Sequence, residues 1–472
     1  MATPPQPDDA PLMASISGCR GIIGATMTPA TVCAYAGAFA AWLRETGTDG
    51  AGPVVVGRDG RRGGSILKRV AISELRASGF SVIDLGVATT PTVGVAVREH
   101  EAAGGLVVTA SHNPAAWNGL KPITAAGRAP TPDEAARLLE FFTAGRSSHV
   151  SVDELGDVDA DGAATHTHVA RVLDALVSVA PLERIKARGF AIAVDSVNAS
   201  GVVGAMLLAD ALGCALTHRH ADESGVFPHA PEPTRENLSG AGGLCDAVRS
   251  GRCDVGFAQD PDADRLAIID EHGEYIGEEY TLALAAEAVL RAADTPGRAL
   301  AANMSTSRMI DDVAGRFGAR VLRTPVGEAH VAGAVDEHGA ALGGEGNGGV
   351  IWPGVVLIRD SLGAIALVLG LLATTGRTVS ECVAALPSYA ILKRKAPIGS
   401  GGAGAALDAI AAQWPEGAVD RRDGVRLDFA GERAWLHVRP SNTEPIIRLI
   451  AEAPEQSRAA RLLDQAEQIV RG

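Results

Sequence analysis

Strand-like apolar runs alternate with helix-like segments along most of the chain. The apolar runs are short and rich in Val, Ile, Leu and Ala, as in strands that are buried on both faces of a sheet. Strands are predicted in this way over residues 54–56, 106–109, 191–194, 254–257 and 266–269. The alternation predicts βαβ units with parallel or mixed sheets, and so an α/β fold.

Helix limits can be predicted at several points of the chain. Thr28 precedes Pro29, a pair that predicts a helix over 29–45 with Thr as its N-cap and Pro at the first helical position. The apolar run 362–373 falls short of the roughly 18 residues that a membrane span needs, so it predicts a buried helix. A last helix is predicted over 455–470.

Changes in this pattern divide the chain into four units. Residues 145–167 are acidic and rich in Asp, Gly and Ser, which is typical of a linker, and the strand pattern restarts after them. Near the C-terminus two strands, 434–438 and 446–450, flank a polar loop. We expect three α/β domains with mixed sheets and a smaller C-terminal α+β domain, at residues 12–150, 165–270, 271–387 and 388–472.

Composition narrows the class of protein. The 472 residues, 46% of them apolar, are enough for three or four domains with sizeable cores. A net charge of −14 argues against nucleic acid or an anionic membrane as the main partner, so local Arg and Lys must hold any anionic ligand. The start of the chain lacks the features of a signal peptide, and the six cysteines show no paired spacing. We expect a cytoplasmic protein, and we disfavour a zinc set of His229, Cys245 and Cys253.

A first candidate loop, TASHNP at residues 109–114, follows a predicted strand. The hydroxyl of Ser111 at a strand end, beside the imidazole of His112, suits a nucleophile or a phosphate carrier. Ser and Asn-Pro are also common in turns that end strands, so the loop alone leaves both interpretations open. A G-x-S-x-G elbow is absent, which disfavours an α/β-hydrolase serine.

A second loop carries Asp260, Asp262 and Asp264 at alternate positions. Three carboxylates that converge suit a hard cation such as Mg²⁺. The spacing imitates a calcium EF-hand, with Glu271 at the twelfth position, but Arg265 stands where that loop needs Gly and the flanks are predicted strands. A solvated acidic loop without an ion is the remaining alternative, and it is costly if the loop is buried.

Two further loops offer ligand groups. Residues 343–349 contain G-x-G-x-x-G, but no helix is predicted directly after them, which disfavours a dinucleotide site. Glu345 and Asn347 there can bind sugar hydroxyls, unless the loop is only a structural glycine turn. Residues 439–445, with Arg448 beyond them, combine amides, hydroxyls and guanidinium groups into a phosphate nest, although a plain hairpin is the alternative.

Together the four loops, in this order and at these separations, resemble those of the α-D-phosphohexomutase superfamily. The resemblance runs from the SGCRG segment at residues 17–21 to the C-terminal phosphate loop. It implies four domains around a central cleft. It also implies an intramolecular phosphotransferase (an isomerase) that acts on hexose or hexosamine phosphates through a bisphosphorylated intermediate. The oligomeric state is not indicated.

The resemblance also implies roles for individual residues. Ser111 would be a phosphoserine that binds Mg²⁺ together with Asp260, Asp262 and Asp264. Glu328 is the first candidate for the general base, with His112 and Lys121 behind it. The basic residues around the reacting phosphate would be Arg20, Lys121 and Arg265. The sugar loop would use Glu345 and Asn347, and the non-reacting phosphate would be held by Arg439, Ser441, Asn442, Thr443 and Arg448.

Two departures from the superfamily pattern concern the substrate. Many members have Glu-x-Ser-Gly-His in the sugar loop, whereas residues 345–349 here read EGNGG. Glu328 also stands where the phosphomannomutase/phosphoglucomutase enzymes carry a His. Both departures favour a phosphoglucosamine mutase, with a phosphomannomutase/phosphoglucomutase as the alternative. A nucleotide-dependent oxidoreductase and a catalytically silent sugar-phosphate-binding protein are disfavoured, the latter because Ser111 and all three Asp are present.

Overall fold

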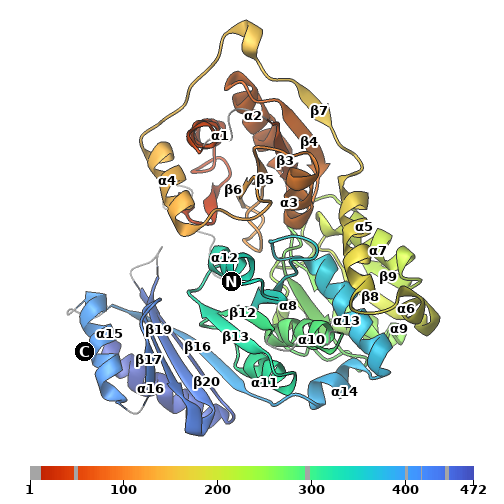
Figure 1. The fold of residues 1–472 in the computed structure, drawn as a ribbon, viewed down its shortest axis with the longest axis vertical. Helices are drawn as coiled ribbons and strands as arrows, with labels where there is room; N and C mark the ends of the chain where they lie inside the picture. The colour runs from red at the N-terminus through yellow and green to blue at the C-terminus, as the bar shows by residue number, and fades with distance from the viewer. Residues whose placement is uncertain are drawn as a thin grey trace.

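Over the residues that the structure describes, four β-sheets follow one another along the chain, and helices cover them (Figure 1). The computed structural model describes residues 12–46, 52–292, 298–398, 402–415, 417–441 and 446–471. The first three sheets mix parallel and antiparallel strands, and the fourth is antiparallel throughout. This arrangement confirms the predicted fold class of three α/β domains and a C-terminal α+β domain.

The first sheet has seven strands in the order β1-β2-β6-β5-β3-β4-β7, of which β3, β4, β5 and β7 run parallel. Its strands are β1 (Met13–Ser15), β2 (Gly18–Ile22), β3 (Val54–Arg58), β4 (Val82–Val87), β5 (Gly104–Val108), β6 (Trp117–Thr124) and β7 (Val158–Ala160). Its helices are α1 (Pro29–Glu45), α2 (Gly64–Ala77), α3 (Thr90–Glu99) and α4 (Pro132–Thr143). The predicted start of α1 is confirmed, because the Thr28 side chain accepts a hydrogen bond from the Thr31 amide.

The expected linker at 145–167 contains more structure than its composition indicates. A short 3₁₀ helix (Val152–Glu154) is followed by β7, which pairs with β4 and so extends the first sheet, and α5 begins at Ala164. The side chains of β7 are all exposed. Backbone pairing at the sheet edge therefore forms this strand without an apolar pattern, so no period of apolar residues marks it in the sequence.

The second sheet has the order β11-β10-β8-β9, and the third has the order β13-β12-β14-β15. The strands of the second are β8 (Ala191–Asp195), β9 (Ala215–Arg219), β10 (Val255–Gln259) and β11 (Leu266–Ile269), and its helices are α5 (Ala164–Val177), α6 (Leu182–Arg188), α7 (Gly201–Ala211), α8 (Arg235–Leu238) and α9 (Leu244–Gly251). The strands of the third are β12 (Ala299–Asn303), β13 (Arg320–Thr324), β14 (Leu342–Glu345) and β15 (Gly349–Ile351), and its helices are α10 (Glu278–Arg291), α11 (Met309–Arg316), α12 (Glu328–His338), α13 (Ser361–Thr375) and α14 (Val379–Ala384).

The fourth sheet has the order β16-β20-β19-β18-β17 and packs against two helices. Its strands are β16 (Ala390–Pro397), β17 (Ala418–Asp420), β18 (Val425–Phe429), β19 (Ala434–Pro440) and β20 (Ile446–Ala453), and the helices are α15 (Gly402–Gln413) and α16 (Gln456–Arg471). This domain has an apolar core of its own, formed by the inward faces of the sheet and the two helices. The predicted last helix is confirmed to within one residue at each end.

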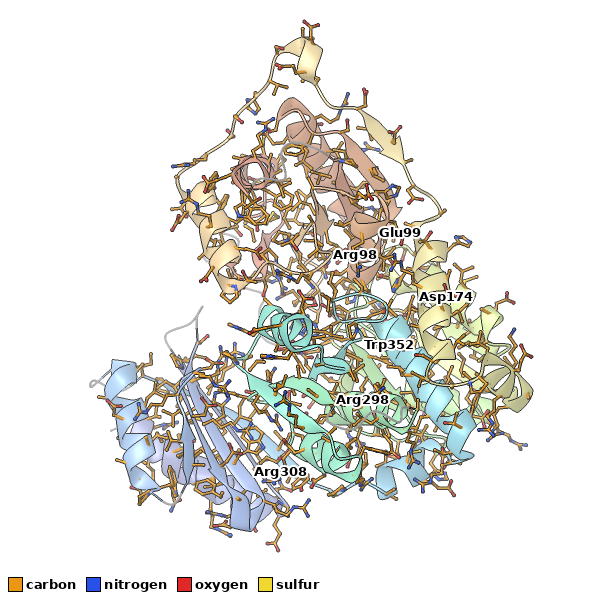
Figure 2. The ribbon with its side chains drawn as sticks, in the orientation of Figure 1. Arg98, Glu99, Asp174, Arg298, Arg308 and Trp352 are labelled. Carbon is orange, nitrogen blue, oxygen red and sulfur yellow. The ribbon has the colours of Figure 1, made fainter. Side chains whose placement is uncertain are left out.

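One continuous apolar cluster joins the three α/β domains. Helix α13 lies at its centre, buried from Ser361 to Leu372 and in contact with α5, α6, α7 and α10, so the predicted buried helix is confirmed. Helices α3 and α5 also contact each other, and Glu99 of α3, labelled in Figure 2, forms an ion pair with Arg171 of α5. In the described part of the chain, no helix combines the length and the apolar character that crossing a membrane requires.

Candidate active site

The first three predicted loops, one from each α/β domain, meet where these domains face one another. Ser111 follows β5, the loop with the three aspartates joins β10 to β11, and Glu345 ends β14. Glu328 is the first residue of α12, a position at which the helix dipole favours a carboxylate. Loops that leave the carboxyl ends of parallel strands commonly form the sites of α/β proteins.

Ser111 lies in a strained and tightly held turn. Its φ of +49° is in the left-handed region, which a residue other than glycine rarely adopts. Its amide donates to Thr109 Oγ1 at 2.8 Å, and Thr109 donates in turn to Asp59 at 2.7 Å. Arg61, buried beside Asp59, donates to the Ser111 carbonyl oxygen and to Asp59 at 2.7 Å. These contacts fix the serine at the domain interface.

The Ser111 hydroxyl contacts the aspartate loop directly. Ser111 Oγ donates to Asp260 Oδ2 at 2.8 Å and lies 3.3 Å from His112 Nδ1. The other oxygen of Asp260 accepts hydrogen bonds from the amides of Asp264 and Arg265, each at 3.1 Å. The first and second domains therefore meet at the serine.

The three aspartates fit a divalent metal ion. All are fully buried, and one carboxylate oxygen from each lies within 4.8 Å of the others. Among the described residues no group donates a hydrogen bond to Oδ1 of Asp262 or to Oδ1 of Asp264. Burial, together with the charges of Asp262 and Asp264, raises the pKa of Asp260 well above its usual range. Unfilled carboxylate oxygens that repel one another are the donor set of a hard cation, so these residues can hold a metal ion.

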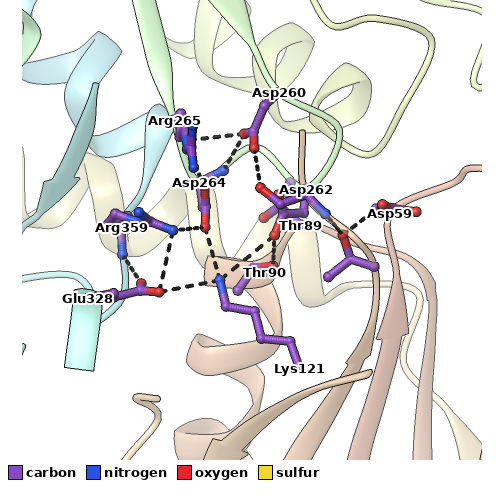
Figure 3. A network of polar contacts seen from close by, with 12 residues as sticks. Asp59, Thr89, Thr90, Lys121, Asp260, Asp262, Asp264, Arg265, Glu328 and Arg359 are labelled. Carbon is purple, nitrogen blue, oxygen red and sulfur yellow. Dashed lines mark hydrogen bonds and ion pairs between the residues drawn. The ribbon is translucent and has the colours of Figure 1, made fainter. Parts of the chain in front are cut away.

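Two cations lie between this triplet and the carboxylates of the third domain (Figure 3). Lys121 Nζ is 2.9 Å from Asp264 and 3.4 Å from Glu328. Arg359 contacts Asp264 and Glu345 at 2.6 Å each, and its amide donates to Glu328 at 2.9 Å. Burial lowers the pKa of Lys121, but Asp264 and Glu328 more than offset this and the pKa is raised overall. Lys121 is therefore a fixed positive charge.

The remaining predicted basic residues surround the other side of the serine loop. Arg265 lies 3.6 Å from Glu232, and Arg20 donates to the side chain of Asn113 at 3.2 Å. Burial and the charges of Arg265 and Arg20 lower the pKa of His112 to about 3. His112 is thus neutral near pH 7, where it can accept a hydrogen bond but is a weak acceptor of a proton.

The glycine-rich loop presents its two polar side chains differently. Glu345 is buried, and its carboxylate accepts hydrogen bonds from Asn303 at 2.8 Å and from the Gly327 amide at 3.2 Å, besides the Arg359 contact. Asn347 is partly buried and accepts a hydrogen bond from the Gly349 amide at 3.2 Å. Glu345 is therefore tied into the network around Arg359, while Asn347 stabilises the loop itself.

A cavity of about 210 Å³ extends from this network to the C-terminal domain. Lys121 and Glu328 line one end, and Arg439, Ser441 and Arg448 line the other. Asn442 and Thr443, which were assigned to the same phosphate loop, lie outside the described residues.

Cations gather at the C-terminal end of the cavity. Arg439 and Arg448 are direct partners across β19 and β20, and Lys395 of β16 is the partner of Arg448 on the other side. Arg439 contacts Asp423 at 3.1 Å. Like charges directly opposite one another destabilise a sheet, and three neighbouring cations at the end of a cavity are able to bind an anion.

Several residues of this site were not identified from the sequence. Arg359 follows an apolar segment and precedes Asp360, the N-cap of α13, and this position gave no hint of its contact with Asp264. Arg61 lies in a polar loop after β3, and this position in a loop at a strand end is the only feature of the sequence that points to a role in the site. Thr90 donates to Asp262 at 2.7 Å from the first turn of α3.

A buried serine lies beside three carboxylates, and Lys121 joins these carboxylates to a cavity whose far end is cationic, an arrangement suited to phosphoryl transfer on a sugar phosphate. Models of the phosphoglucomutase/phosphomannomutase family match the chain four times. Domain I matches residues 14–149, domain II 166–273, domain III 277–389 and the C-terminal domain 393–469. The chain therefore belongs to the phosphoglucomutase/phosphomannomutase family, and the expectation of an intramolecular phosphotransferase is confirmed.

Similar proteins agree with this assignment. A phosphoglucomutase/phosphomannomutase of Thermococcus kodakarensis is 36% identical, over 95% of this chain and 96% of its own length. A probable phosphoglucosamine mutase of Methanopyrus kandleri is 35% identical, over 96% of this chain and 97% of its own. Among solved structures, a phosphoglucomutase/phosphomannomutase family protein of Burkholderia thailandensis matches with a TM-score of 0.81 and 26% identity, covering 97% of each chain.

Proposed function

We propose that the chain interconverts glucosamine 6-phosphate and glucosamine 1-phosphate, with Ser111 as the phosphate carrier. The observation that carries this proposal is the position of Ser111 Oγ, 2.8 Å from Asp260 in the aspartate loop. The adjoining cavity leads from Lys121 and Glu328 to Arg439 and Arg448. A sugar with a phosphate at either end fits such a site, because the cationic end holds one phosphate while the other reacts.

The proposed reaction has two phosphoryl transfers. In the first, a sugar hydroxyl oxygen forms a bond to the phosphorus of phospho-Ser111 while the bond from phosphorus to Oγ breaks, and Oγ keeps the electron pair. Glu328 takes the proton of the attacking hydroxyl, a role that its place in the cavity supports. After the bisphosphorylated sugar has turned round, Oγ attacks its other phosphate, and the departing sugar oxygen recovers the proton from Glu328.

Fixed charges supply the rest of the catalysis. Mg²⁺, which Asp260, Asp262, Asp264 and the serine phosphate would hold, neutralises charge on the transferring oxygens when it is bound. Lys121 and Arg359 keep Asp264 and Glu328 in place. Arg20 and Arg265 flank the serine loop and would contact the reacting phosphate. Burial of Ser111 protects its phosphate from hydrolysis by water.

The choice of glucosamine rests on the carboxylates near the sugar. Glu328 lines the cavity, and a carboxylate there attracts a protonated 2-amino group, by about 1 kcal/mol or more where water is excluded. The relatives named probable phosphoglucosamine mutase support this assignment. The relative named phosphoglucomutase/phosphomannomutase supports the second candidate, a mutase of glucose and mannose phosphates.

A coupled assay on one enzyme preparation distinguishes the two candidates. It compares the 1- and 6-phosphates of glucosamine, glucose and mannose. We expect kcat/KM for glucosamine phosphate to exceed that for mannose phosphate by at least about tenfold, or ~1.4 kcal/mol. Equal or reversed ratios would reject glucosamine as the preferred sugar and leave the mutase activity in place.

A further inference from the structure

A second group of metal-ligating side chains lies in the second α/β domain. Asp195 ends β8, His220 follows the end of β9, and His229 lies in the segment that leads to α8. His220 Nδ1 is 2.9 Å and His229 Nε2 is 3.1 Å from the same atom, Asp195 Oδ2. Within the described parts of the chain, this group and the aspartate triplet are the two whose ligand atoms all lie within 4.8 Å of one another.

The hydrogen bonds of His229 determine which of its nitrogens is free for an ion. Nδ1 lies 2.8 Å from the carbonyl oxygen of Ala230, which only accepts hydrogen bonds, so Nδ1 carries a proton. Nε2 therefore faces the Asp195 carboxylate at 3.1 Å, either as the second N–H of an imidazolium or, in the neutral ring, with its lone pair. A metal ion between the two would take the place of the imidazolium proton or of the lone-pair repulsion. A backbone carbonyl on the second ring nitrogen is also the usual partner that orients a metal-binding histidine.

A backbone group also orients the carboxylate of Asp195. Its Oδ1 accepts the amide of Val197 at 2.9 Å, which leaves Oδ2 directed at the two imidazoles. Asp195 is buried, whereas the side chains of His220 and His229 are 23% and 20% exposed. An ion can therefore reach the group from solvent and keep a water molecule as a further ligand.

We propose that Asp195, His220 and His229 bind one divalent transition-metal ion, with zinc as the favoured ion. Two imidazoles and one carboxylate suit zinc and not Mg²⁺, which prefers oxygen ligands. Ligands about 2.0–2.1 Å from a tetrahedral zinc lie roughly 3.3 Å apart. The 2.9 and 3.1 Å separations in the structure need to widen by only a few tenths of an ångström.

The position of the group suggests a structural role for the ion. It joins the ends of β8 and β9 to the segment that follows, and that segment reaches the Ser111 loop. The Arg61 guanidinium lies over the Phe227 ring, with Cζ 5.3 Å from the ring centroid. Glu232 lies 3.6 Å from Arg265. A bound ion would hold both contacts beside the serine.

Zinc titration of the full chain tests the proposal. Chelator-treated protein in excess Mg²⁺, which occupies the aspartate triplet, is titrated with Zn²⁺ in competition with a chromogenic chelator. We expect one Zn²⁺ ion to bind tightly to each chain. Removing a residue that only hydrogen-bonds a metal ligand costs about 10–100-fold in metal affinity. H220Q and H229Q each remove a ligand itself, so each should weaken zinc binding by at least about 100-fold. His166→Gln, which changes an exposed histidine of α5, should have no effect.

Three results would overturn the proposal: no tight equivalent in the wild type, wild-type affinity in H229Q, or zinc lost on D262N but kept in H229Q. The last result would assign the ion to the aspartate triplet. Zinc-edge X-ray absorption of the loaded wild type gives a test that does not depend on the folding of any variant. Two imidazole ligands would support the site, and a shell of oxygen ligands alone would reject it.

Discussion

Removal of the Arg448 side chain tests whether the C-terminal end of the cavity binds phosphate. Arg448 lines the cavity, is exposed, and lies directly opposite Arg439 and Lys395 in the sheet. A substrate phosphate held here is bound equally in the ground state and in the transition state. Arg448→Ala should therefore raise KM and leave kcat within about twofold of the wild type.

The position of Arg448 determines the size of the effect. A hydrogen bond to a charged group contributes about 1.5–3 kcal/mol, and solvent around an exposed arginine favours the lower end of this range. We expect KM to rise about tenfold, since ~1.4 kcal/mol is a factor of ten. Stability should not fall, because the substitution removes a cation that lies directly opposite two others in the sheet, a placement that destabilises it.

The assay is steady-state kinetics with glucosamine 6-phosphate, with urea unfolding as the check on the fold. Arg394→Ala is the matched control. Arg394 is next to Lys395 in β16 but faces α16, where it pairs with Asp464 at 2.7 Å and Glu467 at 3.2 Å. This control should leave KM unchanged. A fall in kcat at constant KM in Arg448→Ala, or no kinetic change at all, would refute the assignment of this end of the cavity to phosphate.

Three further predictions concern single carboxyl groups. Asp262→Asn should raise the Mg²⁺ concentration needed for half-maximal activity at least about tenfold, because the amide lacks the negative charge of the carboxylate. Tm should change little, because the amide oxygen can still accept the hydrogen bond from Thr90. Full activity at low Mg²⁺ would exclude the loop from the mechanism. Glu328→Gln should lower kcat by about 10²–10⁴ with little change in KM, and a near-normal kcat would place the general base elsewhere. Burial raises the pKa of Glu279 to about 8, so the folded state favours the protonated form. The contribution of the protonated Glu279 to stability is complete below the ordinary pKa of 4.5 and is lost as pH rises through about 8. Tm should therefore fall more steeply with pH in the wild type than in Glu279→Gln. Equal slopes of Tm against pH in the two proteins would contradict this.

Local patterns were enough to predict the parts of the fold and site that depend on nearby residues. The cap at Thr28 and the all-apolar α13 are set by neighbouring residues and by burial, and both were predicted. Ser111 and the alternating aspartates were identified in the same way, because residue type and spacing within one loop indicate their chemistry.

Contacts between distant segments could not be predicted in this way. Arg359 bonds Asp264 across 95 positions, and Lys121 bonds the same carboxylate across 143. No local pattern indicates which arginine or lysine will neutralise a given carboxylate once the domains have packed together. The meeting of Asp195 with His220 and His229 depends likewise on the pairing of β8 with β9 and on the path of the loop beyond.

The most direct test of the account is the location of the transferred phosphate. Purified enzyme is incubated with a bisphosphorylated hexose, digested and analysed by tandem mass spectrometry, and Ser111→Ala is assayed alongside. We predict phosphate on Ser111 and a variant whose kcat is lower by several orders of magnitude. Phosphate on another residue of active enzyme, or near-normal turnover in Ser111→Ala, would contradict the account.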